Sequence, residues 1–219
     1  MLRFLVVEDN EPTLRALKEL LSEEFDAPAI DAASNVAQGS QYIATSFEAG
    51  ETYDAALLDF KLPSSSGESP EIDNSLCEEV CRKHRRALVV RMTAYTQDPV
   101  VIGHLMAGFK ELGGCQPLLV SKSDVAWPSI LRTKLRTFLF SREILQQLTD
   151  LFGFDSSMAS PAYLAKKPTQ NKSGVTHRLA KLTQDIEHHW KDLDPGLQER
   201  IRKIFVVDTS GDDVRVGLL

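Results

Sequence analysis

The chain has 219 residues, of which 42% are hydrophobic and 26% are charged, and its formal net charge is -6 at pH 7. This length and composition suit one globular domain of ordinary size with a smaller addition. The acidic excess lies in residues 1–140, which hold 14 Lys+Arg against 20 Asp+Glu, whereas residues 141–219 hold 11 of each. Because nucleic acids and anionic membranes attract basic surfaces, the first part is not expected to bind either of them in a general way.

Neither a membrane span nor a leader is expected. No apolar stretch approaches the roughly 20 residues needed to cross a bilayer, and the first apolar run ends at Glu8, which is typical of a strand. The three cysteines are odd in number and lack a framework spacing, which favours a reducing compartment. Cys77 and Cys81 are interpreted as ordinary helix residues, because a metal pair would need further ligands. We therefore expect a cytoplasmic protein.

Apolar runs and helical stripes alternate along residues 1–140. The expected strands are Leu2–Val7, Ala29–Ala33, Tyr53–Asp59, Ala87–Met92 and Gln116–Ser121. The expected helices are Glu11–Phe25, Val36–Glu48, Ser75–Arg85, Pro99–Leu112 and Trp127–Phe140. Short and nearly continuous apolar strands that alternate with helices predict an α/β domain, in which helices cover both faces of a parallel sheet.

The pattern changes after residue 140. Ser141–Phe154 either prolongs the fifth helix or forms a separate one, and residues 155–174 are rich in Ser, Pro, Ala and Lys, which indicates a linker or exposed loop. Val175–Trp190 carries an apolar stripe, Pro195–Phe205 is a second short helix, and a hairpin is predicted around Ser210. The expected parts are a first domain over residues 1–140, a helix plus linker over 141–174, and a small mostly helical element over 175–219.

Reactive side chains stand at the carboxyl ends of four of the five expected strands: Glu8 and Asp9 at the first, Asp59 at the third, Thr93 at the fourth and Lys122 at the fifth. In open α/β sheets, ligands bind outside the carboxyl ends of the strands. Each residue alone has an ordinary explanation, such as a helix-starting acid or a solvated lysine. Together they predict a site where carboxylates hold Mg²⁺ and an aspartate attacks phosphorus.

Within that site, Asp59 is the expected nucleophile, Thr93 a hydrogen-bond donor to the phosphoryl oxygens, and Lys122 a cation that pairs with the phosphate. Two other phosphate-handling classes disagree with the residues. The chain lacks the G-x-x-x-x-G-K-[ST] pattern of P-loop proteins. Haloacid-dehalogenase-type phosphatases have a second aspartate two residues after the nucleophile, where this chain has Lys61.

Four segments of this region resemble the receiver domain of two-component response regulators. They are LVVEDN at 5–10, ALLDFKLPSSSG at 56–67, VVRMTA at 89–94 and LLVSKS at 118–123. The resemblance covers residues 1–140 and implies a flavodoxin-like, doubly wound five-stranded parallel sheet of strand order 2-1-3-4-5. It also implies a phosphorylated signalling protein and not a conventional enzyme. Its phosphate would come from a histidine kinase or phosphotransfer protein.

The resemblance implies a role for each residue at the strand ends. Asp59 would accept the phosphoryl group, and Thr93 and Lys122 would couple phosphorylation to a surface change. The residues expected to bind Mg²⁺ are Glu8, Asp9, Asp59 and, through its backbone carbonyl, Lys61.

The chain departs from the receiver pattern at two positions. Ser123 follows Lys122 where the family has a proline in a cis peptide, and a cis bond before serine costs roughly 3 kcal/mol. Leu119 stands at the position of the family's aromatic switch residue. Tyr95 either substitutes for that residue or simply packs against the domain. A degenerate receiver that acts as a scaffold is a rival hypothesis.

The C-terminal segment leaves two functions open. One is an interaction element that docks on the receiver or forms a homodimer through an apolar stripe, and the other is a DNA-binding output module with Arg200, Arg202 and Lys203 in a short helix. The neutral charge balance and the absence of helix-turn-helix spacing favour the first. His188 and His189 are interpreted as ordinary histidines and not as a phosphotransfer site. The residues of the stripe are Leu179, Leu182, Ile186 and Trp190.

Overall fold

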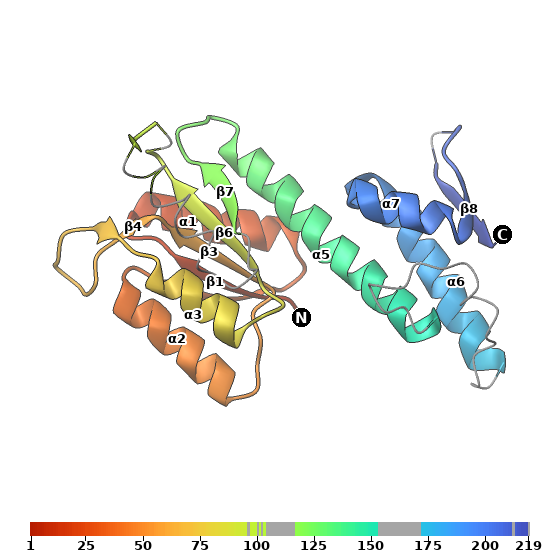
Figure 1. Cartoon of the computed structure of the whole chain (residues 1–219), viewed down its shortest axis with the longest axis horizontal. Helices are drawn as coiled ribbons and strands as arrows, with labels where there is room; N and C mark the ends of the chain where they lie inside the picture. The colour runs from red at the N-terminus through yellow and green to blue at the C-terminus, as the bar shows by residue number, and fades with distance from the viewer. Residues whose placement is uncertain are drawn as a thin grey trace. The chain divides into compact units, whose positions relative to one another are not determined.

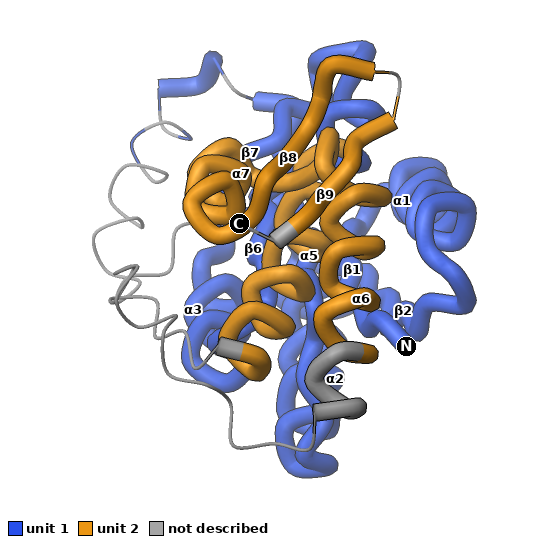
Figure 2. The backbone as a smooth tube through the Cα atoms, turned by 90° about the vertical axis from the view of Figure 1, so that its right-hand side faces the viewer, with its two compact units in different colours: residues 1–132 blue, residues 133–219 orange. Residues whose placement is uncertain are grey.

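The computed structural model describes residues 1–95, 97–99, 101, 103, 117–152, 172–211 and 213–218. The chain divides into two compact units, Met1–Arg132 and Thr133–Leu219, which Figure 2 shows in blue and orange. Most of the helix predicted at Pro99–Leu112 and of the linker predicted at 155–174 lies outside the described residues. The division predicted from the sequence, with borders at residues 140 and 174, stays a prediction.

The first unit is built on a five-stranded parallel sheet of order β2-β1-β3-β6-β7. This order confirms the predicted doubly wound 2-1-3-4-5 arrangement. The three central strands, β1, β3 and β6, are short and almost fully buried, as expected when helices cover both faces, whereas the edge strands β2 and β7 are partly exposed. The strands are β1 (Arg3–Val7), β2 (Ala29–Ala33), β3 (Ala55–Asp59), β6 (Leu88–Thr93) and β7 (Leu118–Ser121).

Alternate residues of these strands face opposite sides of the sheet. On one side, α2 (Val36–Glu48) and α3 (Ser75–Lys83) lie next to each other (Figure 1) and pack on the inward residues of β1, β3 and β6. On the other side, Phe4 of β1 stacks at 5.2 Å on Phe25, the C-cap residue of α1 (Glu11–Glu24). The apolar faces of these helices therefore hold the sheet between two layers.

Local capping explains why α1 and α2 begin where they do. The Asn10 side chain accepts a hydrogen bond from the backbone N–H of Thr13 at 3.0 Å, and Asn35 accepts one from Gln38 at 2.9 Å. Such caps satisfy N–H groups that have no partner inside the helix. Pro12 lies in the first turn of α1, where its missing N–H is not needed.

A short antiparallel ladder follows β3, between the predicted strand that ends at Asp59 and the predicted helix that begins at Ser75. It pairs β4 (Lys61–Leu62) with β5 (Glu71–Ile72), with Lys61 opposite Ile72. The backbone N–H groups of Val36 and Ala37, at the start of α2, donate to the carbonyls of Pro63 and Ser64 at 3.0 Å. The segment after β3 is thus held by backbone pairing.

The second unit has its own core. Helix α5 (Trp127–Phe152) ends in this unit, so the described part of the predicted Ser141–Phe154 segment, up to Phe152, prolongs the fifth helix, which is one of the two arrangements left open. The unit also contains α6 (Lys172–His189), a 3-10 turn (Trp190–Asp192), α7 (Pro195–Arg202) and an antiparallel hairpin, which confirms the predicted one. The hairpin strands are β8 (Phe205–Asp208) and β9 (Arg215–Leu218).

The apolar stripe of α6 is part of this core. Leu182 and Ile186 are 0% exposed and Trp190 is 5% exposed, while Leu179 packs against the same cluster. The hypothesis that this stripe docks on the receiver or forms a homodimer is therefore wrong. The stripe has no free apolar face to offer, because the second unit buries it against its own helices and hairpin.

The histidines and cysteines have structural surroundings. The ring of His189 stacks on Phe140 with centroids 3.9 Å apart, which supports the interpretation of His189 as a packing residue. Cys77 is a buried free thiol, whereas Cys81 is disulfide-bonded, so the two do not form a metal pair. A disulfide at Cys81 also weakens the argument from cysteine count for a reducing compartment. No helix within the described ranges is long and apolar enough to span a membrane.

Candidate functional site

The side chain of Lys122 joins two carboxylates at the carboxyl edge of the sheet. Its Nζ lies 2.9 Å from Oε2 and 3.1 Å from Oε1 of Glu8, and 2.8 Å from Oδ2 of Asp59. All three side chains are largely buried, with exposed fractions of 13% for Lys122, 1% for Glu8 and 10% for Asp59. Lys122 and Glu8 directly follow β7 and β1, and Asp59 ends β3, so the parallel strands place all three at the same edge of the sheet.

The backbone fixes Asp59 at the end of β3. Asp59 pairs with Met92 of β6, and the N–H of the next residue, Phe60, donates to the Met92 carbonyl at 2.9 Å. The same N–H also donates to Asp59 Oδ1 at 2.6 Å. One carboxylate oxygen of Asp59 is therefore held by the backbone, and the other faces Lys122.

Glu8 and Asp9 complete an acidic cluster with Asp59. The backbone N–H of Glu8 donates to the Ala33 carbonyl at 3.0 Å, which continues the pairing of β1 with β2. Carboxylate oxygens of Glu8, Asp9 and Asp59 lie within 4.8 Å of one another. Asp9 is exposed, unlike the other two, so solvent reaches the cluster from its side.

Burial and charge act against each other in this cluster. Burial, together with the charge of Asp59, raises the pKa of Glu8 to about 7, although Lys122 opposes the rise. Burial alone would lower the pKa of Lys122, but the carboxylates of Asp59 and Glu8 outweigh it and leave that pKa raised. The ammonium therefore stays charged and offsets part of the repulsion between the carboxylates.

The cluster suits a hard divalent cation. Its three donors are carboxylate oxygens, the ligand type that Mg²⁺ prefers, and their spacing lets one ion reach all three. One monovalent ammonium does not neutralise three carboxylates. The donor set therefore fits Mg²⁺, as the sequence predicted.

Thr93 ends β6, Lys61 begins β4 two residues after the end of β3, and both contact Tyr95. Thr93 is buried at the end of β6, and its Oγ1 accepts a hydrogen bond from the backbone N–H of Tyr95 at 3.0 Å. The carbonyl of Thr93 accepts from the N–H of Lys122 at 2.7 Å, which positions the lysine. The Nζ of Lys61 lies 4.3 Å from the centroid of the Tyr95 ring.

Both departures from the receiver pattern have visible consequences. The described residues contain no cis peptide bond, so Lys122 and Ser123 are joined in trans. The Ser123 hydroxyl lies 2.7 Å from that of Ser121 and closes this turn by a side-chain contact. Leu119 is 39% exposed and offers no ring to the site.

Sequence reasoning missed Arg91, which is 4% exposed inside β6. Its guanidinium donates to the Asp73 carbonyl at 2.6 Å and to Asn74 Oδ1 at 3.1 Å, and it lies 4.6 Å from the Phe60 ring centroid. Burial lowers the pKa of Arg91. The only available sequence signal was a charged residue in the middle of an apolar strand, which is unusual for a strand buried on both faces.

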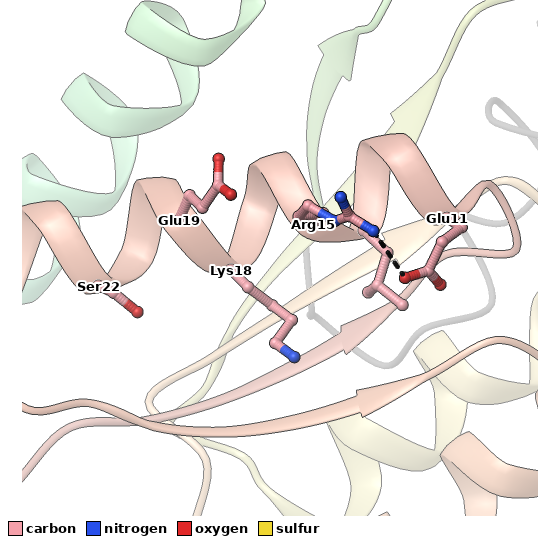
Figure 3. A pocket seen from close by; sticks show the side chains of 6 residues that line it. Glu11, Arg15, Lys18, Glu19 and Ser22 are labelled. Carbon is pink, nitrogen blue, oxygen red and sulfur yellow. Dashed lines mark ion pairs between the residues drawn. The ribbon is translucent and has the colours of Figure 1, made fainter.

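A surface hollow of about 330 Å³ lies along α1 and not at the acidic cluster. Figure 3 shows the side chains that line it, among which Arg15 and Glu11 form an exposed ion pair at 4.0 Å. Such pairs stabilise a helix only slightly. We assign no function to this hollow, which is lined by Glu11, Leu14, Arg15, Lys18, Glu19 and Ser22.

Comparisons with known proteins agree with the sequence motifs. The chain is 24% identical over 209 residues to the DNA-binding transcriptional activator DevR/DosR of Mycobacterium tuberculosis (strain ATCC 25618 / H37Rv). The alignment covers 83% of this chain and 88% of that protein. The first part of the chain resembles response-regulator receiver domains. No family model matches the sequence.

Solved receiver structures are also similar. A response regulator receiver domain protein from Clostridium thermocellum shows 17% identity and a TM-score of 0.49 over 66% of this chain and 99% of its own. A CheY-like receiver domain protein from Methanospirillum hungatei JF-1 shows 22% identity and a TM-score of 0.47 over 65% of this chain and 97% of its own. These low identities and TM-scores give no information on the chemistry of the receiver-like unit (Met1–Arg132).

Proposed function

We propose that this protein is a two-component response regulator that is phosphorylated on Asp59 in the presence of Mg²⁺. A histidine kinase or a phosphotransfer protein would supply the phosphoryl group. The observation that carries the proposal is the Lys122 ammonium, which lies 2.8 Å from Asp59 and 2.9 Å from Glu8 at the carboxyl edge of the sheet. The protein is then a phosphorylated switch and not a conventional enzyme.

The proposed step is the formation of an aspartyl phosphate. A carboxylate oxygen of Asp59 attacks the phosphorus and forms an O–P bond, while the bond from phosphorus to the donor breaks and its electron pair leaves with the donor. Lys122 already contacts Asp59 and balances the added negative charge. Thr93 keeps its own hydroxyl proton when it accepts from Tyr95, so it retains a donor for the phosphoryl oxygens.

Glu8, Asp9 and Asp59 would hold Mg²⁺ together with the backbone carbonyl of Lys61. When bound, the ion reduces the repulsion between these carboxylates and an incoming phosphoryl group. Glu8 and Asp59 already share the Lys122 ammonium. Asp9 is exposed and pairs with no ammonium in the described part of the chain, which makes it the ligand whose loss should affect the ion most selectively.

Incubation with acetyl phosphate and Mg²⁺, followed by intact mass measurement, tests the proposal. We expect one phosphate adduct on the wild-type chain, none on Asp59→Asn, and none when the metal is chelated. A wild-type chain that gains no phosphate under conditions that phosphorylate a control receiver would contradict the proposal. It would support the rival hypothesis of a degenerate receiver that acts as a scaffold.

A DNA-binding output is a second candidate function. It is favoured by the relative, a DNA-binding transcriptional activator that aligns with 83% of this chain, and by the burial of the stripe that an interaction element would have used. The exposed cations Arg200 and Lys203 at the end of α7, with Arg215 on the hairpin, are the candidate phosphate contacts.

Binding to mixed-sequence duplex DNA at several salt concentrations tests this candidate. Because cations that contact phosphates release counterions, we expect affinity to fall as salt rises, with a slope reduced by about one unit for each lost contact. Arg200→Ala should weaken binding, whereas Arg85→Ala in the first unit should not. No binding at low salt, with or without phosphorylation, would remove the DNA hypothesis.

A further inference from the structure

Arg91 is a charged side chain in the middle of β6, and neither the proposed Mg²⁺ site nor the proposed phosphoryl transfer uses it. It is 4% exposed, and it pairs with Leu58 of β3, the residue before Asp59. A buried cation costs free energy unless polar groups compensate it, so its contacts indicate what it does. These contacts converge on Phe60, the residue that follows Asp59.

Phe60 is held on three sides. Its N–H donates both to Asp59 Oδ1 at 2.6 Å and to the Met92 carbonyl at 2.9 Å, and its carbonyl accepts from the Asp73 N–H at 3.3 Å. The centroid of its ring lies 4.6 Å from Arg91 Cζ, and Phe60 as a whole is 1% exposed. Asp59 thus receives a hydrogen bond from a residue that Arg91 contacts directly.

Arg91 also holds Phe60 through the segment that precedes α3. Its guanidinium donates to the Asp73 carbonyl at 2.6 Å, and the N–H of the same Asp73 donates to the Phe60 carbonyl. Met92, whose carbonyl accepts the Phe60 N–H, is the next residue after Arg91 in β6. These four residues therefore form a closed ring of contacts, and the Phe60 backbone cannot turn without breaking one of them.

We propose that Arg91 is a positioning residue that acts through Phe60 to fix the direction of the Asp59 carboxylate, an inference that rests on the proposed function. With Oδ1 of Asp59 bonded to the Phe60 N–H, Oδ2 faces Lys122 at 2.8 Å. If Phe60 turns, Oδ1 loses its donor and the carboxylate rotates out of this arrangement. Reacting groups misplaced by about 1 Å can lose about 100-fold in rate, so a residue that does not touch the phosphorus still affects the rate.

Phosphorylation rates distinguish positioning from a loss of stability. At saturating Mg²⁺ and fixed acetyl phosphate, Arg91→Met should gain the phosphate adduct about 10- to 100-fold more slowly than the wild type, measured by intact mass per folded molecule. Urea unfolding of each variant gives the folded fraction. The matched control is Leu17→Ala in α1, which removes a side chain that is 1% exposed and lowers stability from the other side of the sheet. Per folded molecule, this variant should react at the wild-type rate.

The Phe60 amide reports the geometry directly. The chain has 10 phenylalanines, so labelling with ¹⁵N-phenylalanine gives few signals, and Phe60→Leu identifies the one that is lost. We expect this amide proton downfield in the wild type, because its bond to a carboxylate is short and charge-assisted. In Arg91→Met it should move upfield, even without phosphate, whereas Leu17→Ala should leave it in place.

A double-mutant cycle tests whether Arg91 acts through Phe60. Phe60→Leu keeps the backbone N–H but removes the ring, so it should slow phosphorylation as Arg91→Met does. The double variant should be little slower than either single variant, whereas losses that multiply would overturn the path through Phe60. If Arg91→Met does not fold, Phe60→Leu decides alone: a slowed rate per folded molecule supports the proposal, and an unaltered rate overturns it.

Failure of the positioning role can be told apart from failure of the proposed function. A wild-type rate per folded molecule in Arg91→Met would overturn the positioning role, wherever the amide signal lies, and would leave phosphorylation at Asp59 standing. A wild-type chain that gains no adduct would contradict the proposed function. The Phe60 amide, measured without phosphate, would then still show whether Arg91 orients the Asp59 carboxylate.

Discussion

At the scale of single residues, Glu8 and Asp9 have different surroundings, although the sequence motif predicts the same role for both carboxylates. Glu8 is 1% exposed and bonded to Lys122, whereas its neighbour Asp9 is exposed and borders the cluster from the solvent side. Removing a group from a buried ion pair leaves an uncompensated charge, while removing an exposed carboxylate does not. We therefore expect Glu8 to support both folding and the proposed Mg²⁺ site, and Asp9 to support mainly the proposed Mg²⁺ site.

This difference predicts the behaviour of Asp9→Asn. Without Mg²⁺ its free energy of unfolding should stay within about 0.5 kcal/mol of the wild type, as for most exposed sites. Saturating Mg²⁺ should stabilise the wild type by about 2.7 kcal/mol at a hundred times its dissociation constant, and the variant much less. Thermal midpoints measured in MgCl₂ and in EDTA check both statements. An unchanged response to Mg²⁺ in Asp9→Asn would remove Asp9 from the ligand set.

His84 gives a pH-dependent prediction far from the carboxyl edge. It is 1% exposed, its Nε2 lies 3.3 Å from both Ser46 Oγ and the Ile43 carbonyl, and burial lowers its pKa. The unfolded chain therefore takes up a proton on His84 below about pH 6.5 that the folded protein resists. The part of the free energy of unfolding that depends on a neutral His84 is therefore fully present above about pH 6.5. It is lost as the pH falls below that value.

In His84→Gln, the stability of the first unit should depend less on pH below about 6.5. The slope lost is at most about 1.4 kcal/mol per pH unit, because only one proton is involved. Urea unfolding between pH 5 and 8, compared with the wild type, measures this slope. Equal acid slopes in the two proteins would show that His84 does not resist protonation in the folded state.

At the scale of secondary structure elements, the segment after β3 depends on a side chain from the neighbouring strand. Arg91 in β6 donates to the Asp73 carbonyl and to Asn74 at the start of α3, so its guanidinium is bound by neutral acceptors. A buried guanidinium needs such hydrogen bonds because its desolvation is costly. Arg91 therefore ties the end of this segment to the sheet that holds Asp59.

We expect Arg91→Met to destabilise the first unit by about 1–3 kcal/mol, since it leaves buried acceptors without a donor. The stability of Arg91→Lys should lie between that of the wild type and that of Arg91→Met, because lysine keeps the charge but not the planar fork. Hydrogen exchange in residues 61–74 should increase in both variants. The matched control is Arg85→Met, an exposed arginine at which a change of less than about 0.5 kcal/mol is expected. If Arg91→Met and Arg85→Met destabilised the protein equally, Arg91 would not hold this segment to the sheet.

The sequence predicted best those elements that have a regular spacing of apolar residues and a helix-capping residue. β2 and α2 have the predicted bounds, because Asn35 caps a helix that follows a short apolar run. β4 and β5 have two residues each, too few to show any period, so no strand was predicted there. The four strand-end motifs placed Glu8, Asp59 and Lys122 together, but the contacts of Arg91 and Tyr95 depend on neighbouring strands and were not predictable from local pattern.

At the scale of the whole molecule, the burial of α6 decides what the second unit can offer to partners. An amphipathic stripe in a sequence fits equally well with an internal core and with an exposed docking face. Only the packing of α6 with α5, α7 and the hairpin distinguishes them, and these contacts join residues distant in the chain. The exposed surface of the second unit includes the cations of α7 and the outer face of the hairpin.

Ile186→Ala tests this arrangement. If Ile186 lies in the core, its truncation should lower the stability of the second unit by about 2–5 kcal/mol without changing the oligomeric state. Trp190 emission in a Trp127→Phe background reports on this unit, because Trp190 is 5% exposed in the same core. Val206→Ser, on the exposed face of the hairpin at 51%, should change stability by less than about 0.5 kcal/mol. If α6 instead formed a dimer, Ile186→Ala would change the sedimentation of the protein and leave the monomer's unfolding largely unaltered.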